Sequence, residues 1–373
     1  MARLKSFNVK DFMTGKGRII RPFLWLAAGL FFTQGYGQKE QQLSLSFNSL
    51  NYSEVSSLHS IAGRWSDSIS SGDEAWSMSR LALSYQNQDY VIEALYRADT
   101  YYQFANETAQ VLYLAENHLP LEPGRRYPLL IKPNKLSSSG FRFGLKAAGD
   151  SLQMTAYISL LKPTKILQGQ LSGSALALDT NDYDLEFSSD LVYDADPLYD
   201  RPAENISGQG YALDLTLAYQ PTKRWRFDLE LLDIAGHLSI DHAPYTSAEA
   251  TSDIKSFDPD GFVTYDPVVT GREGFRPFTY DFSLQLHFSA DYRLANENSV
   301  IFQHHEILGF NYQRFIYRQN LENSQLSWQL IPKVKALGVM YQTPYFNIGI
   351  EADSLDYRKM KFLSLVSQLF WTF

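Results

Sequence analysis

The stretch "YALDLTLAY", residues 211–219, is the part of the sequence that most directly indicates the fold. Its apolar positions are Tyr211, Leu213, Leu215, Leu217 and Tyr219, and between them stand Ala212, Asp214, Thr216 and Ala218. Successive side chains of a β-strand point to opposite faces. The stretch therefore predicts a strand with one apolar face and one polar face.

The apolar face of this strand is long enough to cross the hydrocarbon core of a membrane. Strands rise about 3.3 Å per residue, so Tyr211 and Tyr219 should lie roughly 26 Å apart. Transmembrane β-barrels carry an outward apolar band ~25 Å tall, with aromatic residues at both interfaces. The length and the two tyrosines both fit such a band.

Three further segments repeat the alternation. After the short turn "QPTK", the stretch 224–231 alternates charged and apolar residues, and segment 183–193 does so with one interruption, at Ser189. We predict one continuous strand over 277–293, with an apolar face that runs from Phe278 through Tyr280 and Phe282 to Tyr292. A secreted soluble β-protein would alternate too. Two features favour the membrane barrel. The apolar faces are long and have aromatic residues at both ends, and the polar faces carry both signs of charge.

The first 37 residues predict an export signal. Their basic residues are Arg3, Lys5, Lys10, Lys16, Arg18 and Arg21. An apolar run follows, "FLWLAAGLFF", and small residues come next at Gly35 and Gly37, the pattern of a secretory signal peptide. The run is too short for a membrane-spanning helix, although an uncleaved anchor is the alternative. The barrel is then expected over residues 38–373.

Composition excludes several classes of function. The net charge of −8 argues against nucleic acid as a partner, because nucleic-acid sites gather Lys and Arg. The chain has no cysteine, which excludes a lipid-anchored cysteine, disulfides and thiolate metal sites. No cofactor is expected, and no apolar run after residue 37 is long enough for a membrane-spanning helix.

The chain ends in "FLSLVSQLFWTF", with Leu365, Leu369, Trp371 and Phe373 at alternate positions and Ser367 as the one departure. This ending resembles the C-terminal strand of Gram-negative outer-membrane β-barrel proteins. The resemblance implies an outer-membrane location after export through the inner membrane. It also implies that these four residues are a signal read by the barrel-assembly machinery, and that outer-membrane lipid and lipopolysaccharide surround the barrel.

Alternation and turn residues together predict an all-β fold, a single antiparallel barrel of about fourteen strands, with twelve or sixteen as alternatives. The expected strands are 42–50, 75–86, 90–103, 126–147, 151–161, 166–178, 183–194, 209–219, 224–240, 277–293, 299–318, 333–341, 345–352 and 360–373. Periplasmic turns are expected at 87–89, 148–150, 179–182, 220–223, 294–299 and 342–344. Residues 241–276 should form a long external loop, suited to recognition or to constricting the mouth.

No motif in the sequence establishes a reaction. His304 and His305 are neighbours on a strand and should face opposite sides, which argues against a shared metal. Asp258 and Asp179 open stretches that fall short of a calcium loop, because position 12 lacks the bidentate Glu. No G-x-S-x-G nucleophile elbow is present.

The polar faces of the strands supply the candidate functional residues. We expect the following side chains to line the lumen: Asp214, Thr216, Arg224, Arg226, Asp228, Glu230, Asp281, Gln285, His287, Asp291 and Arg293. In an open lumen their charges would select permeating solutes, whereas in a narrow one they would pair and hold the barrel together.

The sequence therefore favours a porin-like channel or transporter for a small hydrophilic solute, whose identity it does not specify. One alternative is a non-conducting barrel that anchors or assembles a surface structure. A second is an outer-membrane lipid hydrolase.

Overall fold

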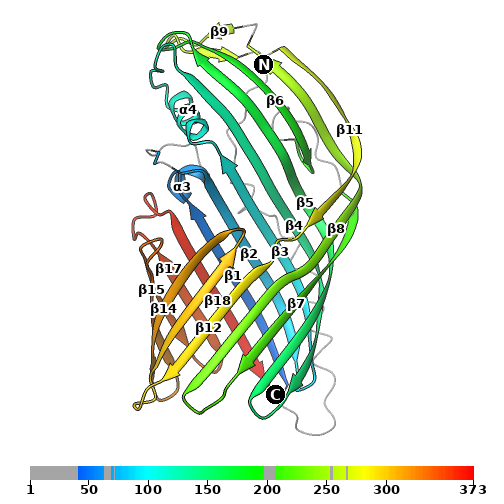
Figure 1. Cartoon of the computed structure of the whole chain (residues 1–373), viewed down its shortest axis with the longest axis vertical. Coiled ribbons are helices and arrows are strands. Elements are labelled where there is room, and N and C mark those ends of the chain that lie inside the picture. Colours follow the sequence, from blue (N-terminus) through cyan, green and yellow to red (C-terminus); the bar gives the residue numbers. More distant parts are fainter. Residues whose placement is uncertain (1–40, 63–68, 71, 197–205, 253–254, 266–267) are drawn as a thin grey trace.

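The computed structural model describes residues 41–62, 69–70, 72–196, 206–252, 255–265 and 268–373 (Figure 1). The predicted signal peptide lies outside these residues. Within them, no helix is both long enough and apolar enough to cross a membrane.

Most of the described chain is strand. In chain order the elements are β1 (Gln42–Ser53), α3 (Leu58–Ala62), β2 (Glu74–Gln86), β3 (Tyr90–Phe104), α4 (Asn106–Glu116), β4 (Arg126–Ala148), β5 (Leu152–Ala177), β6 (Tyr183–Tyr193), β7 (Gly208–Tyr219), β8 (Trp225–Thr251), β9 (Lys255–Phe257), β10 (Val263–Tyr265), β11 (Val268–Asp281), β12 (Gln285–Arg293), β13 (Ser299–Ile307), β14 (Phe310–Asn320), β15 (Gln325–Ile331), β16 (Ala336–Gln342), β17 (Phe346–Ala352) and β18 (Phe362–Thr372).

These strands form a closed antiparallel barrel of fourteen strands, as the sequence predicts. The ring runs β1–β2–β3–β4–β5–β7–β8–β12–β13–β14–β15–β16–β17–β18, and β18 pairs with β1. Above the ring, β4, β5 and β8 continue upward, β6 pairs between β5 and β8, and β11 pairs along the other edge of β8. Figure 1 shows the result, a barrel with one tall wall and one short wall.

The number of strands is right, but the strands themselves differ from the prediction. Segments 151–161 and 166–178 form the single long strand β5, and 183–194 forms β6, which lies above the ring. Segment 299–318 is two strands, β13 and β14, and residues 319–332, which lie between two predicted strands, contain β15. The merger and the displaced β6 remove two strands from the predicted ring, and the split and β15 add two. The total therefore stays at fourteen.

Two predicted connections are also wrong. Residues 241–276 are mostly strand, because β8 extends to Thr251 and β11 begins at Val268. The turn at 179–182 lies at the top of the tall wall, where the Asn181 carbonyl accepts the Val263 N–H at 3.0 Å. Alternation also continues into the strands of the tall wall, so the sequence pattern does not show where a strand leaves the ring.

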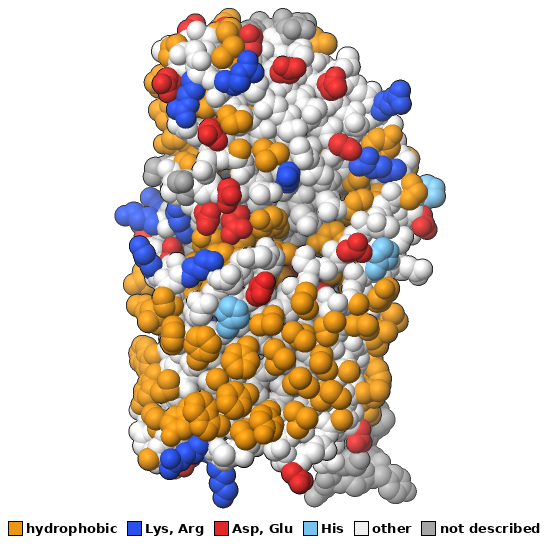
Figure 2. Space-filling view, in the orientation of Figure 1, with side chains coloured by type: hydrophobic (Ala, Val, Ile, Leu, Met, Phe, Trp, Pro, Cys, Tyr) orange, Lys and Arg blue, Asp and Glu red, His pale blue; other side chains and the backbone are white. Residues whose placement is uncertain are grey.

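The outer surface carries an apolar band around the lower half of the barrel. Figure 2 shows hydrophobic side chains covering this region and charged ones gathering above it and at its lower edge. Large exposed apolar side chains in the band include Ile158, Leu160, Leu213, Trp328, Leu337, Ile348 and Ile350. Of the predicted assembly signal, Leu369, Trp371 and Phe373 are exposed and Leu365 is half-buried; its role in assembly stays a prediction.

The interior is filled by side chains. One apolar cluster includes Trp76 on β2 and Phe310 on β14, whose ring centroids are 5.4 Å apart although the two strands lie nearly opposite each other in the ring. Another includes Leu136, Leu238, Tyr280 and Phe282 beneath the tall wall. The barrel is therefore narrow enough for opposite walls to touch.

The wall of the barrel is irregular where β8 passes β7 and β12. Leu213 pairs with Ala235 and Leu215 with Leu231, so β8 has two more residues than β7 over the same length. Asp233, within this bulge, has a φ of 57°. Bulges re-aim side chains, and this one turns Asp233 into the interior.

The predicted strand 277–293 is interrupted at the same height. β11 ends at Asp281 and β12 starts at Gln285, with Phe282 held by its N–H bond to the Gly236 carbonyl at 3.1 Å. The interruption reverses the phase of alternation, so Tyr280 and Phe282 are buried inside instead of facing lipid. The prediction of one unbroken apolar face was wrong.

The band predicts a depth-dependent cost for an added charge. Ala156 is exposed on β5 between Met154 and Ile158, and Gln209 is exposed on β7 above the band. Ala156→Arg should destabilise the barrel by ~2–4 kcal/mol, and the control Gln209→Arg by ~0–1 kcal/mol. Urea unfolding in phospholipid vesicles measures both. Equal costs for the two variants would contradict the placement of the band.

Candidate functional site

Arg97 on β3 lies at the centre of a buried polar network. Its guanidinium donates to both carboxylate oxygens of Asp233 on β8, at 2.8 and 3.0 Å, and to Asp99 at 2.9 Å. The same guanidinium lies 4.6 Å from the centroid of the Phe282 ring. Bidentate pairing satisfies the planar donors of Arg. All three charged residues are nearly inaccessible, with Arg97 only 5% exposed and Asp233 2% exposed.

The two backbone irregularities build this contact. The bulge turns Asp233 inward, and its N–H donates to the Asp214 carboxylate at 2.7 Å. The interruption between β11 and β12 brings Phe282 under the guanidinium and lets the Gln285 amide donate to Asp233 at 3.2 Å. Without the bulge, β8 would not place the Asp233 carboxylate against the Arg97 guanidinium.

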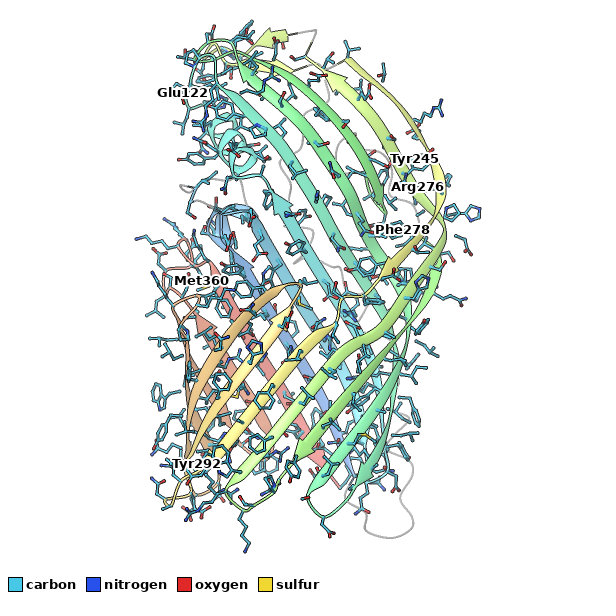
Figure 3. All side chains as sticks on the ribbon, in the orientation of Figure 1. Glu122, Tyr245, Arg276, Phe278, Tyr292 and Met360 are labelled. Atoms are coloured by element: carbon cyan, nitrogen blue, oxygen red, sulfur yellow. The ribbon has the colours of Figure 1, made fainter. Side chains whose placement is uncertain are left out.

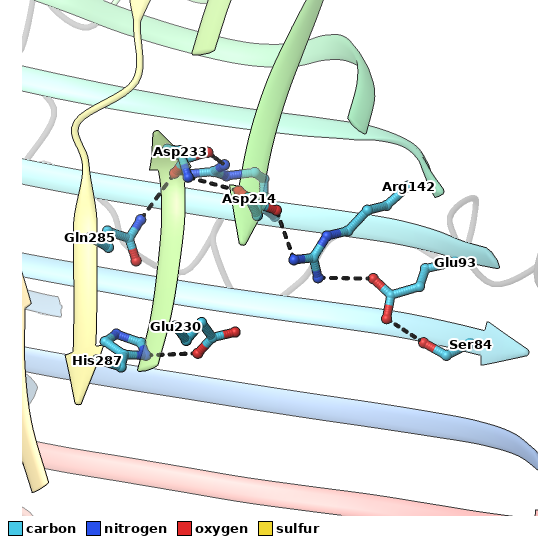
Figure 4. A network of polar contacts seen from close by, with 9 residues as sticks. Ser84, Glu93, Arg142, Asp214, Glu230, Asp233, Gln285 and His287 are labelled. Atoms are coloured by element: carbon cyan, nitrogen blue, oxygen red, sulfur yellow. Dashed lines mark hydrogen bonds and ion pairs between the residues drawn. The ribbon is translucent and has the colours of Figure 1, made fainter. Parts of the chain in front are cut away.

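The network continues toward β2 (Figure 4). Asp214 on β7 pairs with Arg142 on β4 at 2.8 Å, and Arg142 donates to Glu93 on β3 at 3.1 Å. Glu93 in turn accepts the Ser84 hydroxyl at 2.6 Å. Arg142 also covers the Tyr157 ring at 3.8 Å from its centroid. The chain of contacts thus links β8, β7, β4, β3 and β2 across the interior.

Two further interior contacts flank this chain. His287 on β12 contacts Glu230 on β8 at 3.0 Å (Figure 4). The His305 ring lies next to His287, with centroids 4.7 Å apart, and stacks on Tyr312. Arg314 contacts His305 and donates to Glu351 at 2.7 Å. Polar groups therefore meet across much of the barrel at mid-height.

Charges nearer the short-turn end are more exposed. Arg226 pairs with Asp228 at 2.8 Å, with 53% and 37% of their side chains exposed. Asp291 pairs with Arg318 at 3.2 Å, and both side chains are half-buried. Exposed pairs such as Arg226–Asp228 contribute little to stability, so this end resembles a wet vestibule more than a packed core.

The structure brings together four predicted lumen residues, Asp214, Glu230, Gln285 and His287, in or beside the network. Thr216, Arg226, Asp228 and Asp291 lie on the same interior faces of β7, β8 and β12, closer to the short turns. Arg224 belongs to the β7–β8 turn, and Arg293 ends β12 and pairs with Glu297 at 3.6 Å.

Asp281 is placed differently from the other predicted residues. It follows the buried Tyr280 on β11, so its side chain points to the opposite, outer face. There it contacts His237 at 2.7 Å and is 81% exposed. The phase reversal after Phe282 is the physical reason.

Sequence reasoning missed Arg97, Asp99, Asp233, Arg142 and Glu93. Alternation within the predicted strand 90–103 already places Glu93, Arg97 and Asp99 on one face, and this signal was available. No comparable signal exists for Asp233, because its inward direction depends on the bulge.

The other motifs behave as turns and packing residues. Asp179 accepts the N–H of Asn181 and Asp182, and Asp258 accepts the N–H of Asp260 and Phe262. His304 contacts Gln313 while His305 faces Arg314. Over the described ranges, no group of three or more His, Asp or Glu side chains could hold a metal ion.

A polar pocket of about 580 Å³ opens at the rim of the short wall, between the ends of β1 and β2, the β15–β16 turn and the β17–β18 loop. Tyr52 and Phe362 contribute to its lining and also belong to the apolar cluster around Trp76. Burial lowers the pKa of the Lys361 ammonium at this rim. Burial, with repulsion from Glu54, raises the pKa of the Glu74 carboxyl close by. We call this feature the mouth pocket.

No protein-family model matches the chain, and no curated protein matches it. Among solved structures, the P. putida toluene transporter TodX is 10% identical, with a TM-score of 0.39, over 90% of this chain and 89% of TodX. The monoaromatic hydrocarbon channel CymD is 11% identical, with a TM-score of 0.42, over 90% of this chain and 88% of CymD. The barrel assignment rests on the strand register above, and these weak likenesses add no argument.

The central ion pair predicts a large, rescuable loss of stability. Arg97→Met leaves Asp99 and Asp233 buried without their cation, which should cost about 3–5 kcal/mol. The triple variant Arg97→Met, Asp99→Asn, Asp233→Asn removes the stranded charges and should recover much of this loss. Guanidinium unfolding of the purified barrel measures the differences.

The exposed pair Arg226–Asp228 supplies the matched control. Arg226→Met should change the free energy of unfolding by less than about 1 kcal/mol. If Arg97→Met cost no more than Arg226→Met, the network would not stabilise the barrel as described.

Proposed function

We propose that this chain is an outer-membrane β-barrel that transports a small hydrophilic solute through a lumen closed at mid-height by the Arg97 network. The apolar band on the outside supports the location, because polar backbone can cross lipid only as helices or closed barrels. The lumen is the only interior surface that such a barrel offers to a solute.

One observation carries the proposal. The interior is polar and charged at both of its ends, with Arg226, Asp228 and Asp291 toward the short turns and the mouth pocket at the opposite rim. Charged groups are costly to enclose unless they are paired or hydrated. A barrel with only a structural role would be more stable with apolar side chains in place of these charged residues.

The network between these ends supports a closed resting state. Arg97 bridges β3 to β8, and its partners are almost inaccessible to solvent. A solute must therefore displace or bypass both the ion pairs and the apolar cluster around Trp76 in order to pass. Opening the lumen loses the free energy of the ion pairs unless the solute or water replaces their contacts. The network would therefore act as a gate that favours polar solutes.

The second candidate is a non-conducting barrel that anchors a surface structure. The tall wall of β4, β5, β6, β8 and β11 favours it, because the wall rises well above the apolar band and would stand clear of the membrane (Figures 1 and 2). Arg276 on β11, Tyr245 on β8 and Asp190 on β6 brace this wall, with Arg276 paired to Asp190 at 2.8 Å (Figure 3).

Single-channel recording of the purified protein in planar bilayers distinguishes the two. We expect small, infrequent openings from the wild type. The triple variant Arg97→Met, Asp99→Asn, Asp233→Asn should open more often, since it lacks the ion pair but strands no charge. Arg226→Met, at the wet end, should alter ion selectivity and leave the opening frequency unchanged.

A heat-modifiable shift on gels confirms that each variant is folded. A folded and inserted barrel that stays silent in the wild type and in the triple variant would reject transport and support the anchoring role.

A further inference from the structure

The mouth pocket carries an unusual arrangement of charge. Six charged side chains line it, three acidic and three basic: Glu54, Asp73, Asp353, Lys333, Lys335 and Lys361. Across the described part of the chain, no acidic member of this set forms an ion pair with a basic one. Opposite charges around one small pocket would ordinarily pair, whereas the hydrogen-bonded members of this set contact neutral groups instead.

The basic side is held by contacts with neutral groups. The Lys361 ammonium donates to the Glu54 carbonyl at 2.7 Å and to the Ser70 hydroxyl. The Lys333 ammonium donates to the Asn311 carbonyl at 2.8 Å and lies 3.8 Å from the Phe310 ring centroid. Lys335 is exposed on the same turn and, among the described residues, has no hydrogen-bond or ion-pair partner. The positive charge of this wall is therefore available to a ligand.

The acidic side is likewise held by neutral donors. The Glu54 carboxylate accepts the Tyr52 hydroxyl at 3.2 Å and the Asp73 N–H at 3.3 Å. Asp353 accepts the backbone N–H groups of Lys361 and Phe362, both at 3.0 Å. The carboxylate of Asp73 is exposed and has neither a hydrogen-bond donor nor a cation against it within the described ranges.

We propose that the mouth pocket binds a small zwitterion, a molecule with an ammonium at one end and a carboxylate at the other, such as a short peptide. Its carboxylate would lie against Lys335 and Lys333, and its ammonium against Asp73 and Glu54. The volume of about 580 Å³ falls within the usual range for small-molecule sites. Such a ligand pairs with the lysines and with the carboxylates of the pocket at once. A simple anion would be repelled by the carboxylates, and a simple cation by the lysines.

The position of the pocket connects binding to the lumen. Tyr52 and Phe362 lie between the pocket and the aromatic cluster that fills the barrel below it. Met360, next to Lys361, stands at the top of the short wall, so a ligand reaches the pocket without crossing the tall wall (Figure 3). The binding site itself does not require transport. Only its role as the entrance for the solute rests on the proposed function.

Calorimetric titration of the purified, detergent-solubilised protein tests the site without requiring transport. The probes are glycylglycine, acetyl-glycylglycine, which lacks the ammonium, and glycylglycinamide, which lacks the carboxylate. We expect glycylglycine to bind, and each analogue to bind roughly ten- to a hundredfold more weakly, as loss of one charged contact implies.

Variants locate the site. Lys335→Gln and Asp73→Asn should each weaken glycylglycine binding roughly ten- to a hundredfold. The matched controls are Lys359→Gln and Asp356→Asn. Their side chains lie 4.0 Å apart on the β17–β18 loop at the same rim, and they do not line the pocket. These controls should leave binding unchanged.

Absence of glycylglycine binding, equal binding of all three probes, or equal effects of pocket and control variants would each overturn the zwitterion site. A barrel that binds glycylglycine but conducts nothing would keep the site and reject transport. A barrel that conducts but does not bind would reject the site alone.

Discussion

The pairing of Arg97 with Asp233 is the constraint around which the interior is organised. Removing one guanidinium and two carboxylates from water costs several kcal/mol per ion, and only close, well-directed pairing offsets that cost. The bidentate contact at 2.8 and 3.0 Å provides such pairing. It requires the bulge that turns Asp233 inward and the interruption that places Phe282 beneath the guanidinium. Two departures from regular strand geometry are thus stabilised by one interaction.

The same constraint separates the barrel into regions with different chemistry. Below the network, exposed pairs such as Arg226–Asp228 leave polar groups accessible from the short-turn end. Above it, the clusters around Trp76 and Leu238 fill the interior, and the mouth pocket opens at the rim. A solute path through this barrel has two polar ends, and the ion-pair network together with the apolar clusters closes the interior between them. Its selectivity would depend on which molecules can replace the contacts they break.

Much of the architecture could be predicted from local alternation, and some could not. The strand at 211–219 exposes Tyr211, Leu213 and Tyr219 on the outer surface of the barrel, as its pattern predicts. The polar face that holds Glu93, Arg97 and Asp99 is equally legible in the sequence, although it was not among the candidates. Both depend only on the period of a strand.

Asp233, Tyr280 and Phe282 could not be placed in this way. Their directions depend on where β7 and β8 lose register and on where β8 changes its partner from β12 to β11, and register is set by pairing between distant segments. The strand count came out right because two strands lost from the ring and two strands gained cancelled. Local patterns do not show which strands belong to the ring and which to the wall above it.

Accessibility of the interior tests the central claim most directly. The chain has no cysteine, so a single Ser289→Cys substitution, on the interior face of β12 below the network, supplies a unique thiol. A membrane-impermeant thiol reagent added outside intact cells should fail to label it in the wild-type background. It should label it once Arg97→Met, Asp99→Asn and Asp233→Asn are present. Rapid labelling from outside in the wild-type background would show an open lumen and contradict the account.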